Sequence, residues 1–125
     1  MLCIIAPAKR IKTDEVFMSP RHQPFFLEDS WKLLPTLKAL NQEQLRRLLK
    51  CSPQIAEEAR KQYQILDLNE EGTPAILSYD GIQYQTMAPH VFTDEQLDYV
   101  ERHVRILSGF YGLLRPLDGI HPHRL

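Results

Sequence analysis

The sequence predicts a mixed α/β fold in one domain, with an N-terminal strand, several helices and a short hairpin. The chain opens on a short apolar run rich in β-branched residues, which is typical of a buried strand. Three later segments begin with the capping residues of helices. A strong turn dipeptide, Asp80-Gly81, lies between two further apolar stretches. With 125 residues, of which 43% are hydrophobic and 25% charged, the chain is long enough to bury a core.

The composition excludes several classes of protein. No apolar run approaches the roughly 20 residues that a membrane helix needs, so no membrane partner is expected. Cys3 and Cys51 form neither a disulfide framework nor a zinc-binding pattern. Two reduced, structural cysteines make a cytoplasmic protein the simplest inference.

The net charge of −1 hides an uneven distribution along the chain. Residues 1–24 carry a net charge of +2 and residues 102–125 carry +3, whereas residues 25–101 carry −6. If the two ends lie together in the fold, they form one basic face on an acidic body. Such a face would attract a polyanion, although its positive charge is modest.

The first strand is expected over residues 2–5. Its continuous apolar character is typical of a strand that is covered on both faces of a sheet. The strand leads into Ala6-Pro7-Ala8-Lys9, and ligands of open α/β sheets bind beyond the carboxyl ends of strands. Lys9 is therefore placed to meet an anion. The alternative is a solvated lysine after a strand.

Three helices are expected next. The first covers residues 28–40, where Pro35 either kinks or divides it. Asn41 with Gln44 resembles a capping box and begins the second helix. Ser52 followed by Pro53 begins the third. The charges on these helices are most simply solvated, and they suggest no chemistry.

A second strand is expected over residues 74–79, with a return arm over residues 82–84 across the Asp80-Gly81 turn. Tyr79, Asp80, Tyr84 and Gln85 would then cluster near the turn. Such a cluster could serve a ligand or could pack within a hairpin.

The helix with the strongest start signals begins at Thr93, where Gln96 completes a capping box. Its expected apolar stripe consists of Leu97, Val100, Val104 and Leu107.

The helix is expected to lead into a turn with Gly109 and Gly112 around an aromatic pair, followed by Arg115 beside Pro116. An arginine on a rigid, apolar-anchored turn suits the recognition of an anion such as phosphate. The alternative is a packed corner in which Arg115 pairs with Asp118.

Other motifs are weak or missing from the sequence. There is no glycine-rich phosphate loop, nucleophile elbow or His-Glu-x-x-His helix. Asp118, His121 and His123 are close enough in sequence to suggest metal ligands, but Pro122 separates the two histidines. The expectation is therefore no metal site and no cofactor.

Three blocks of the sequence resemble a known family. They are residues 4–9 (Ile-Ile-Ala-Pro-Ala-Lys), residues 75–84, and residues 105–118 together with residues 122–125. In order and spacing they are similar to the peroxide stress protein YaaA family. The family's chain continues beyond the equivalent of this sequence. The resemblance therefore implies that residues 1–125 are a single unit, the N-terminal part of a longer domain.

The resemblance implies a cytosolic bacterial protein that limits oxidative DNA damage and free iron under hydrogen peroxide. It also implies a basic cleft and a helix-hairpin-helix-like element that bind duplex or branched DNA. The helix from Thr93 with the turn at Gly109 and Gly112 is the candidate for that element. The residues expected to contact phosphates are Lys9, Gly109, Gly112, Arg115 and Arg124.

The expected function is thus a non-enzymatic, DNA-binding role in the peroxide response. The alternative is an enzyme that acts on a small, phosphate-bearing anion near Lys9, Tyr84 and Arg115, with Tyr84 and Asp118 as possible pocket residues. A third hypothesis is iron handling by Asp118, His121 and His123. The sequence departs from the family pattern at Asp80, where some members have lysine, and at His123, where tyrosine is usual.

Overall fold

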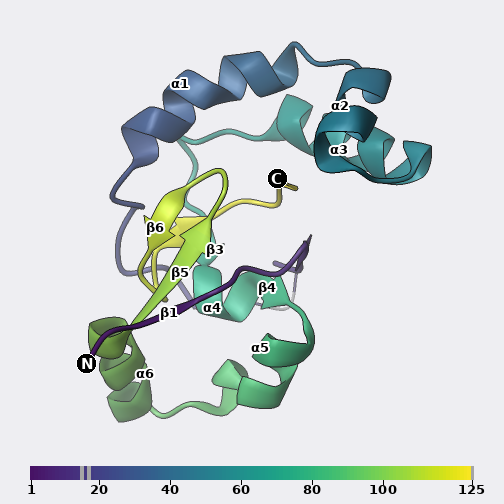
Figure 1. The fold of residues 1–125 in the computed structure, drawn as a ribbon. Helices are drawn as coiled ribbons and strands as arrows, with labels where there is room; N and C mark the ends of the chain where they lie inside the picture. The colour runs from purple at the N-terminus through teal and green to yellow at the C-terminus, as the bar shows by residue number, and fades with distance from the viewer. Residues whose placement is uncertain (15, 17, 125) are drawn as a thin grey trace.

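The computed structural model describes residues 1–14, 16 and 18–124, and it confirms the mixed α/β fold class (Figure 1). The helices are α1 (Leu27–Lys38), α2 (Gln42–Leu49), α3 (Pro53–Ile65), α4 (Ala75–Ser78), α5 (Ile82–Met87), the 3-10 helix η1 (Pro89–Val91) and α6 (Asp94–His103). The strands are β1 (Cys3–Ile5), β2 (Arg10–Ile11), β3 (Thr73–Pro74), β4 (Tyr79–Asp80), β5 (Val104–Ser108), β6 (Gly112–Leu114) and β7 (Gly119–Ile120).

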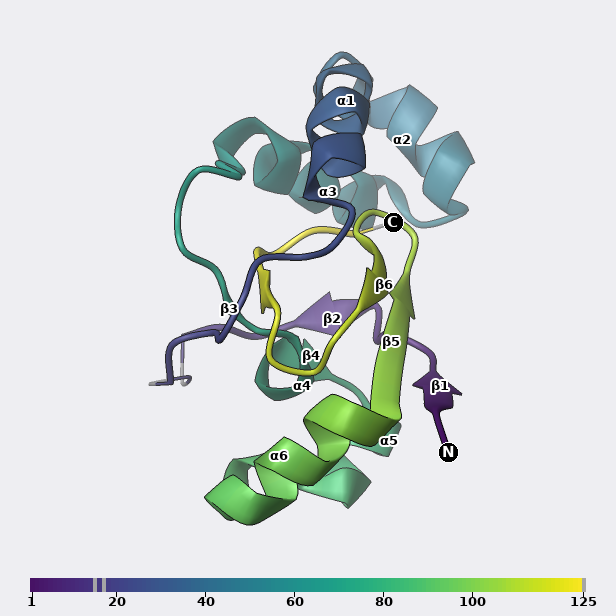
Figure 2. The ribbon, with the colours of Figure 1, turned by 90° about the vertical axis from the view of Figure 1, so that its left-hand side faces the viewer.

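The strands form three small sheets between two groups of helices. The largest has the order β1-β5-β6, in which β5 pairs parallel with β1 and antiparallel with β6. Two further pairs, β2 with β4 and β3 with β7, are antiparallel. Figures 1 and 2 show α1, α2 and α3 on one side of the strands and α5 and α6 on the other. The parallel pairing of β1 with β5 joins the two basic ends of the sequence.

The helices α2 and α3 begin where their capping residues predict, whereas α1 follows Phe26 and has no side-chain cap. Asn41 forms a full capping box with Gln44, and the Ser52 hydroxyl accepts a hydrogen bond from the third helical amide of α3. Pro35 lies inside α1 and does not divide it. Local capping chemistry therefore sets the starts of α2 and α3.

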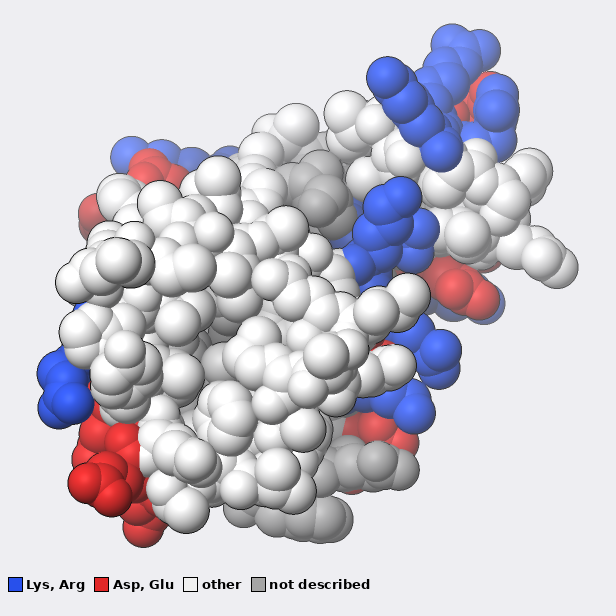
Figure 3. Space-filling model, turned by 60° about the horizontal axis from the view of Figure 1, so that its bottom comes forward, with Lys and Arg blue, Asp and Glu red and all other residues white. Residues whose placement is uncertain are grey.

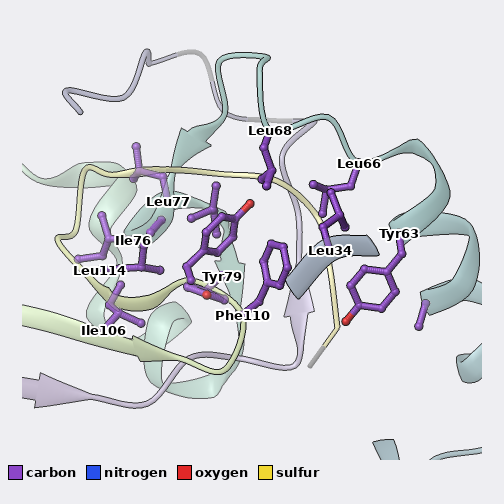
Figure 4. Packing of buried hydrophobic residues seen from close by; sticks show 14 of the residues in the cluster. Leu34, Tyr63, Leu66, Leu68, Ile76, Leu77, Tyr79, Ile106, Phe110 and Leu114 are labelled. Atoms are coloured by element: carbon purple, nitrogen blue, oxygen red, sulfur yellow. The ribbon is translucent and has the colours of Figure 1, made fainter. Parts of the chain in front are cut away.

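Buried side chains from the helical side and the sheet side meet around Phe110 (Figure 4). Its ring lies 6.4 Å from that of Tyr63 on α3 and is almost fully buried. Ile106 of β5 and Leu114 of β6 fill the sheet side of the same core. None of the helices in the described part of the chain has the length and apolar character needed to span a bilayer.

The predicted strand–hairpin over residues 74–84 is wrong. Residues 75–78 form the single helical turn α4, and residues 82–87 form α5, with Gly81 as its N-cap. A short apolar run fits a buried helical turn as well as a strand, and here burial on all sides decides. The predicted cluster is nevertheless present: the rings of Tyr79 and Tyr84 lie 5.5 Å apart, and the Gln85 amide donates to Asp80 at 2.9 Å.

The predicted length of the last helix is also wrong. The Thr93 capping box is present, but α6 ends at His103, and Val104 is already extended. Val104 and Leu107 therefore belong to β5 and not to a helical stripe. Pairing with β1 at one edge and β6 at the other satisfies the backbone of this segment, so tertiary context overrides the helical pattern.

This outcome corrects the expected helix-hairpin-helix-like element. The turn at Gly109 and Gly112 joins the antiparallel strands β5 and β6, so it is a β-hairpin that follows a helix. No second helix follows the turn in the described residues up to Arg124.

The first strand is covered on one face only. Ile5 packs against the core, whereas Leu2 and Ile4 are exposed. The expectation of a strand buried on both faces is therefore wrong for the residues that the structure describes.

Candidate functional site: a basic pocket between the two ends of the chain

Lys9 and Arg124 line one pocket, although they lie near opposite ends of the sequence. The pocket has a volume of about 100 Å³, and Tyr79, Ser108 and His123 contribute to its lining. A wider groove of about 430 Å³ is lined by the same two basic residues and by side chains of α3. The two basic ends of the chain therefore do lie together at this point of the fold.

Buried tyrosines hold both ends of the chain in place. The Tyr84 hydroxyl donates to the Ala6 carbonyl at 2.6 Å, which fixes the segment that leads from β1 to Lys9. The Tyr63 hydroxyl of α3 donates to the Arg124 carbonyl. Burial raises the pKa of Tyr84 above its usual value, so the phenol remains a donor. Tyr84 thus positions the backbone beside the pocket and is not itself among the residues that line it.

Two hydroxyl groups lie beneath the basic residues. The Ser108 hydroxyl accepts from the backbone amides of Phe110 and Tyr111, at 3.3 and 3.1 Å, which leaves its proton to donate elsewhere. The Tyr79 hydroxyl is buried and makes no hydrogen bond of good geometry among the described residues, although Ser108 lies close enough to oppose the rise in its pKa. Burial raises the pKa of Tyr79 to about 12, so it is a neutral donor at pH 7. A buried, unpartnered hydroxyl is costly and calls for a ligand or water.

His123 adds a neutral imidazole to the pocket. Its ring lies 5.3 Å from the ring of Phe110 and 5.1 Å from that of Tyr111. Nδ1 lies 2.8 Å from the His121 carbonyl, so it carries the proton, and Nε2 has a free lone pair in the neutral ring. Burial lowers the pKa of His123 to about 4. The imidazole is therefore uncharged at pH 7 and can accept a hydrogen bond.

The pocket combines two cations, two hydroxyl donors and one acceptor nitrogen. No ion pair among the described residues involves Lys9 or Arg124. Unpaired lysine and arginine beside hydroxyl donors are the groups that bind phosphate oxygens. The arrangement is suited to a phosphate-bearing ligand.

Arg115 lies elsewhere and is already engaged. Its Nε donates to Asp118 Oδ1 at 2.8 Å, and its Nη2 donates to the Gln23 carbonyl at 2.9 Å. The guanidinium also lies 3.8 Å from the centroid of the Phe25 ring. The alternative prediction, a packed corner in which Arg115 pairs with Asp118, is confirmed.

Asp118 belongs to a buried network that the sequence did not suggest. Its second oxygen accepts from the Arg115 amide at 2.8 Å, and its first lies 3.8 Å from His22 Nε2. Glu101 of α6 binds His22 at 2.7 Å and accepts from the Leu117 amide at 2.6 Å. Burial raises the pKa of Asp118, and its bonds to Arg115 oppose that rise. The network joins α6 to the 115–118 turn and leaves little of Asp118 for a ligand.

A model of the peroxide stress protein YaaA family matches residues 1–125. The chain belongs to this family. It is 52% identical to a UPF0246 protein of Desulfitobacterium hafniense, 47% identical to one of Pediococcus pentosaceus and 46% identical to one of Lactiplantibacillus plantarum. Each comparison covers all 125 residues of this chain and 50% of the relative. This YaaA-family chain therefore spans about half the length of the curated relatives it matches.

The three residues considered as metal ligands in this YaaA-family chain point to separate partners. Asp118 binds Arg115, His121 Nε2 lies 3.0 Å from the Glu70 carbonyl, and His123 Nδ1 faces the His121 carbonyl. Among the described residues, no group of three His, Cys, Asp or Glu side chains could hold one metal ion. The geometry does not support iron handling by these residues.

The sequence predicted the two cations of the Lys9–Arg124 pocket but not the other polar residues that line it. Tyr79 was expected near a hairpin turn, and His123 was considered only as a metal ligand. Ser108 gave no signal of its own, because the sequence predicted a helix up to Leu107, and only the strand β5 places it on the same face as the buried Ile106. A serine on a buried strand face needs a hydrogen-bond partner.

Proposed function

We propose that this YaaA-family protein binds the phosphate backbone of DNA in the pocket between Lys9 and Arg124. The peroxide-stress role comes from the family. DNA binding is the proposed activity, and it would serve this role by limiting oxidative damage to the DNA. The observation that carries the proposal is the convergence of these two cations, which have no ion-pair partner among the described residues, in a pocket that polar groups also line. The proposal does not depend on contacts from Gly109 or Gly112, nor on Arg115, which is held by Asp118.

The surroundings of the pocket favour a polyanion over a small neutral ligand. Arg10 lines the adjoining groove and pairs only weakly with Asp80, at 3.5 Å. Glu58 is an acidic residue in that groove, so the basic character is concentrated at the Lys9 side. Figure 3 shows that Lys and Arg side chains gather beside a broad uncharged face. Contacts of this type position a phosphate backbone and read no bases.

The test is a fluorescence-anisotropy titration of a labelled duplex and a labelled four-way junction at two salt concentrations. Affinity should fall with salt, because each phosphate contact releases counterions. Lys9→Ala and Arg124→Ala should each weaken binding and lower the log–log salt slope by about one unit.

The matched control is Lys32→Ala, which removes an exposed lysine of α1 and should leave both quantities unchanged. The proposal is contradicted if affinity is independent of salt. It also fails if the Lys9 and Arg124 variants bind as tightly as the control.

A second candidate function is binding or turnover of a small phosphate ester in the same pocket. The unpartnered Tyr79 hydroxyl and the neutral His123 favour it, because backbone DNA contacts at the rim would leave both unused. Thermal unfolding with inorganic phosphate, a nucleoside monophosphate and duplex DNA separates the two. Stabilisation by the small anions alone, lost in Tyr79→Phe, would favour the second candidate.

A further inference from the structure

The sheet formed by β1, β5 and β6 has one buried face and one open face. Cross-strand partners share a face, so Ile5, Ile106 and Leu114 lie together on one side. These residues belong to the core or pack against it, and Ile106 and Leu114 are fully buried. The other face is set by the same alternation along each strand.

The open face is also apolar. Its residues include Leu2, Ile4 and Leu107, which are 53%, 60% and 56% exposed. Leu113, the partner of Leu107 in the antiparallel ladder, extends the row into β6. Arg105 lies on this face opposite Ile4, but its guanidinium turns back to donate to carbonyls at the end of α6.

No described element lies over this face. In Figure 1, β1 and β5 lie in front of α4, and in Figure 2, turned by 90°, they form the right-hand border of the molecule. Among the described strands β1 pairs only with β5, so its outer backbone edge is open as well. Parallel strands are ordinarily covered on both faces, and open apolar edges promote association.

The matched relatives indicate what covers it. The Desulfitobacterium hafniense protein is 52% identical to this chain, yet the match takes up only 50% of its length. That protein therefore carries a further segment of about equal size. An exposed row of leucine and isoleucine fits the apolar interior of a fold better than it fits a nucleic acid.

We propose that the open face of the β1-β5-β6 sheet docks a polypeptide equivalent to the second half of the relatives. The docked polypeptide continues the sheet at the free edge of β1 and packs apolar side chains on Leu2, Ile4 and Leu107. Main-chain hydrogen bonds at the edge supply affinity, and the leucine and isoleucine row sets the register. This surface is separate from the Lys9–Arg124 pocket, so either proposal can fail without the other.

The test is co-expression of the tagged 125-residue chain with the untagged second half of the Desulfitobacterium hafniense relative. The two should copurify in equal amounts. Backbone amides of Cys3, Ile4 and Ile5 should then exchange at least about tenfold more slowly than in the chain alone. Leu107→Lys and Ile4→Lys should each weaken the complex at least about tenfold, because each places a charge on a face that becomes buried.

The control is Ile65→Lys, which alters a still more exposed isoleucine at the end of α3 and should not affect copurification. Circular dichroism of each variant alone confirms that the chain still folds. The proposal is overturned if the tagged chain is recovered alone, or if copurification survives both substitutions on the sheet. It is also overturned if the chain alone forms a dimer that protects the same amides, since the occupant is then a second copy.

Discussion

His123 shows at the residue scale how packing changes the chemistry of a side chain. It lies between two aromatic rings and is 5% exposed, and burial lowers its pKa to about 4. In the unfolded chain an ordinary histidine has a pKa near 6.5. Between these two values the unfolded state binds more protons than the folded state. Protonation of His123 therefore destabilises the folded state.

A pH prediction follows from this difference. The contribution of His123 to the free energy of unfolding should be constant above about pH 6.5 and should fall as the pH drops toward 4, by up to about 3 kcal/mol. His123→Phe keeps the aromatic packing and should remove most of that slope. Urea unfolding at several pH values measures it. His90→Phe, on an exposed histidine, should retain the slope, and an equal slope in the His123 variant would contradict the prediction.

At the element scale, the β5–β6 hairpin replaces the expected helix-hairpin-helix element, and its two glycines are not equivalent. Gly112 has φ of +75°, and a Cβ built there would lie 3.1 Å from a carbon of the Phe26 ring. No such positive φ occurs at Gly109, which is exposed. The local requirement for glycine therefore rests on Gly112, where the strand must begin in a left-handed conformation.

Alanine substitutions should separate the two glycines. Gly112→Ala should destabilise the chain by about 1–2 kcal/mol, since it adds left-handed strain and crowds Phe26. Gly109→Ala should change the stability by no more than about 0.5 kcal/mol. Thermal or urea unfolding measures both. If both variants lose the same free energy of unfolding, the loss comes from the turn as a whole and not from the conformation of Gly112.

At the scale of the whole molecule, neighbouring residues of β5 have opposite environments. Ile106 is completely buried in the core between the helices and the sheet, whereas Leu107 lies on the open face. The pairing of β1 with β5 also brings the two basic ends of the chain together, and the hydroxyls of Tyr84 and Tyr63 hold them there. The arrangement of the strands thus determines both the pocket and the open face.

Truncation of these two neighbours should have very different effects in the isolated chain. Ile106→Ala should cost about 2–5 kcal/mol, because it leaves a cavity in the core. Leu107→Ala should stay within about 0.5 kcal/mol, because the side chain has few contacts to lose. Equilibrium unfolding in urea compares them. A loss for Leu107→Ala close to that of Ile106→Ala would show that the open face is covered in solution.

The sequence alone predicted the features that depend on near neighbours. The capping boxes at Asn41 and Thr93 and the proline-led start at Ser52 are local hydrogen-bond patterns, and all three are present. The mixed fold class follows from such local patterns, and the family follows from the sequence blocks at residues 4–9, 75–84 and 105–118. Lys9 was named as a candidate because it follows a strand, and the structure places it at a pocket.

Only the tertiary structure decided the features that depend on distant partners. Residues 104–108 form a strand because β1 and β6 pair with them, and residues 75–78 form a helical turn because they are buried on all sides. The joining of Lys9 with Arg124 and the partnerless Tyr79 hydroxyl depend on that packing. A sequence carries helix and turn signals within a few residues, but strand pairing and burial are set by contacts across the whole chain.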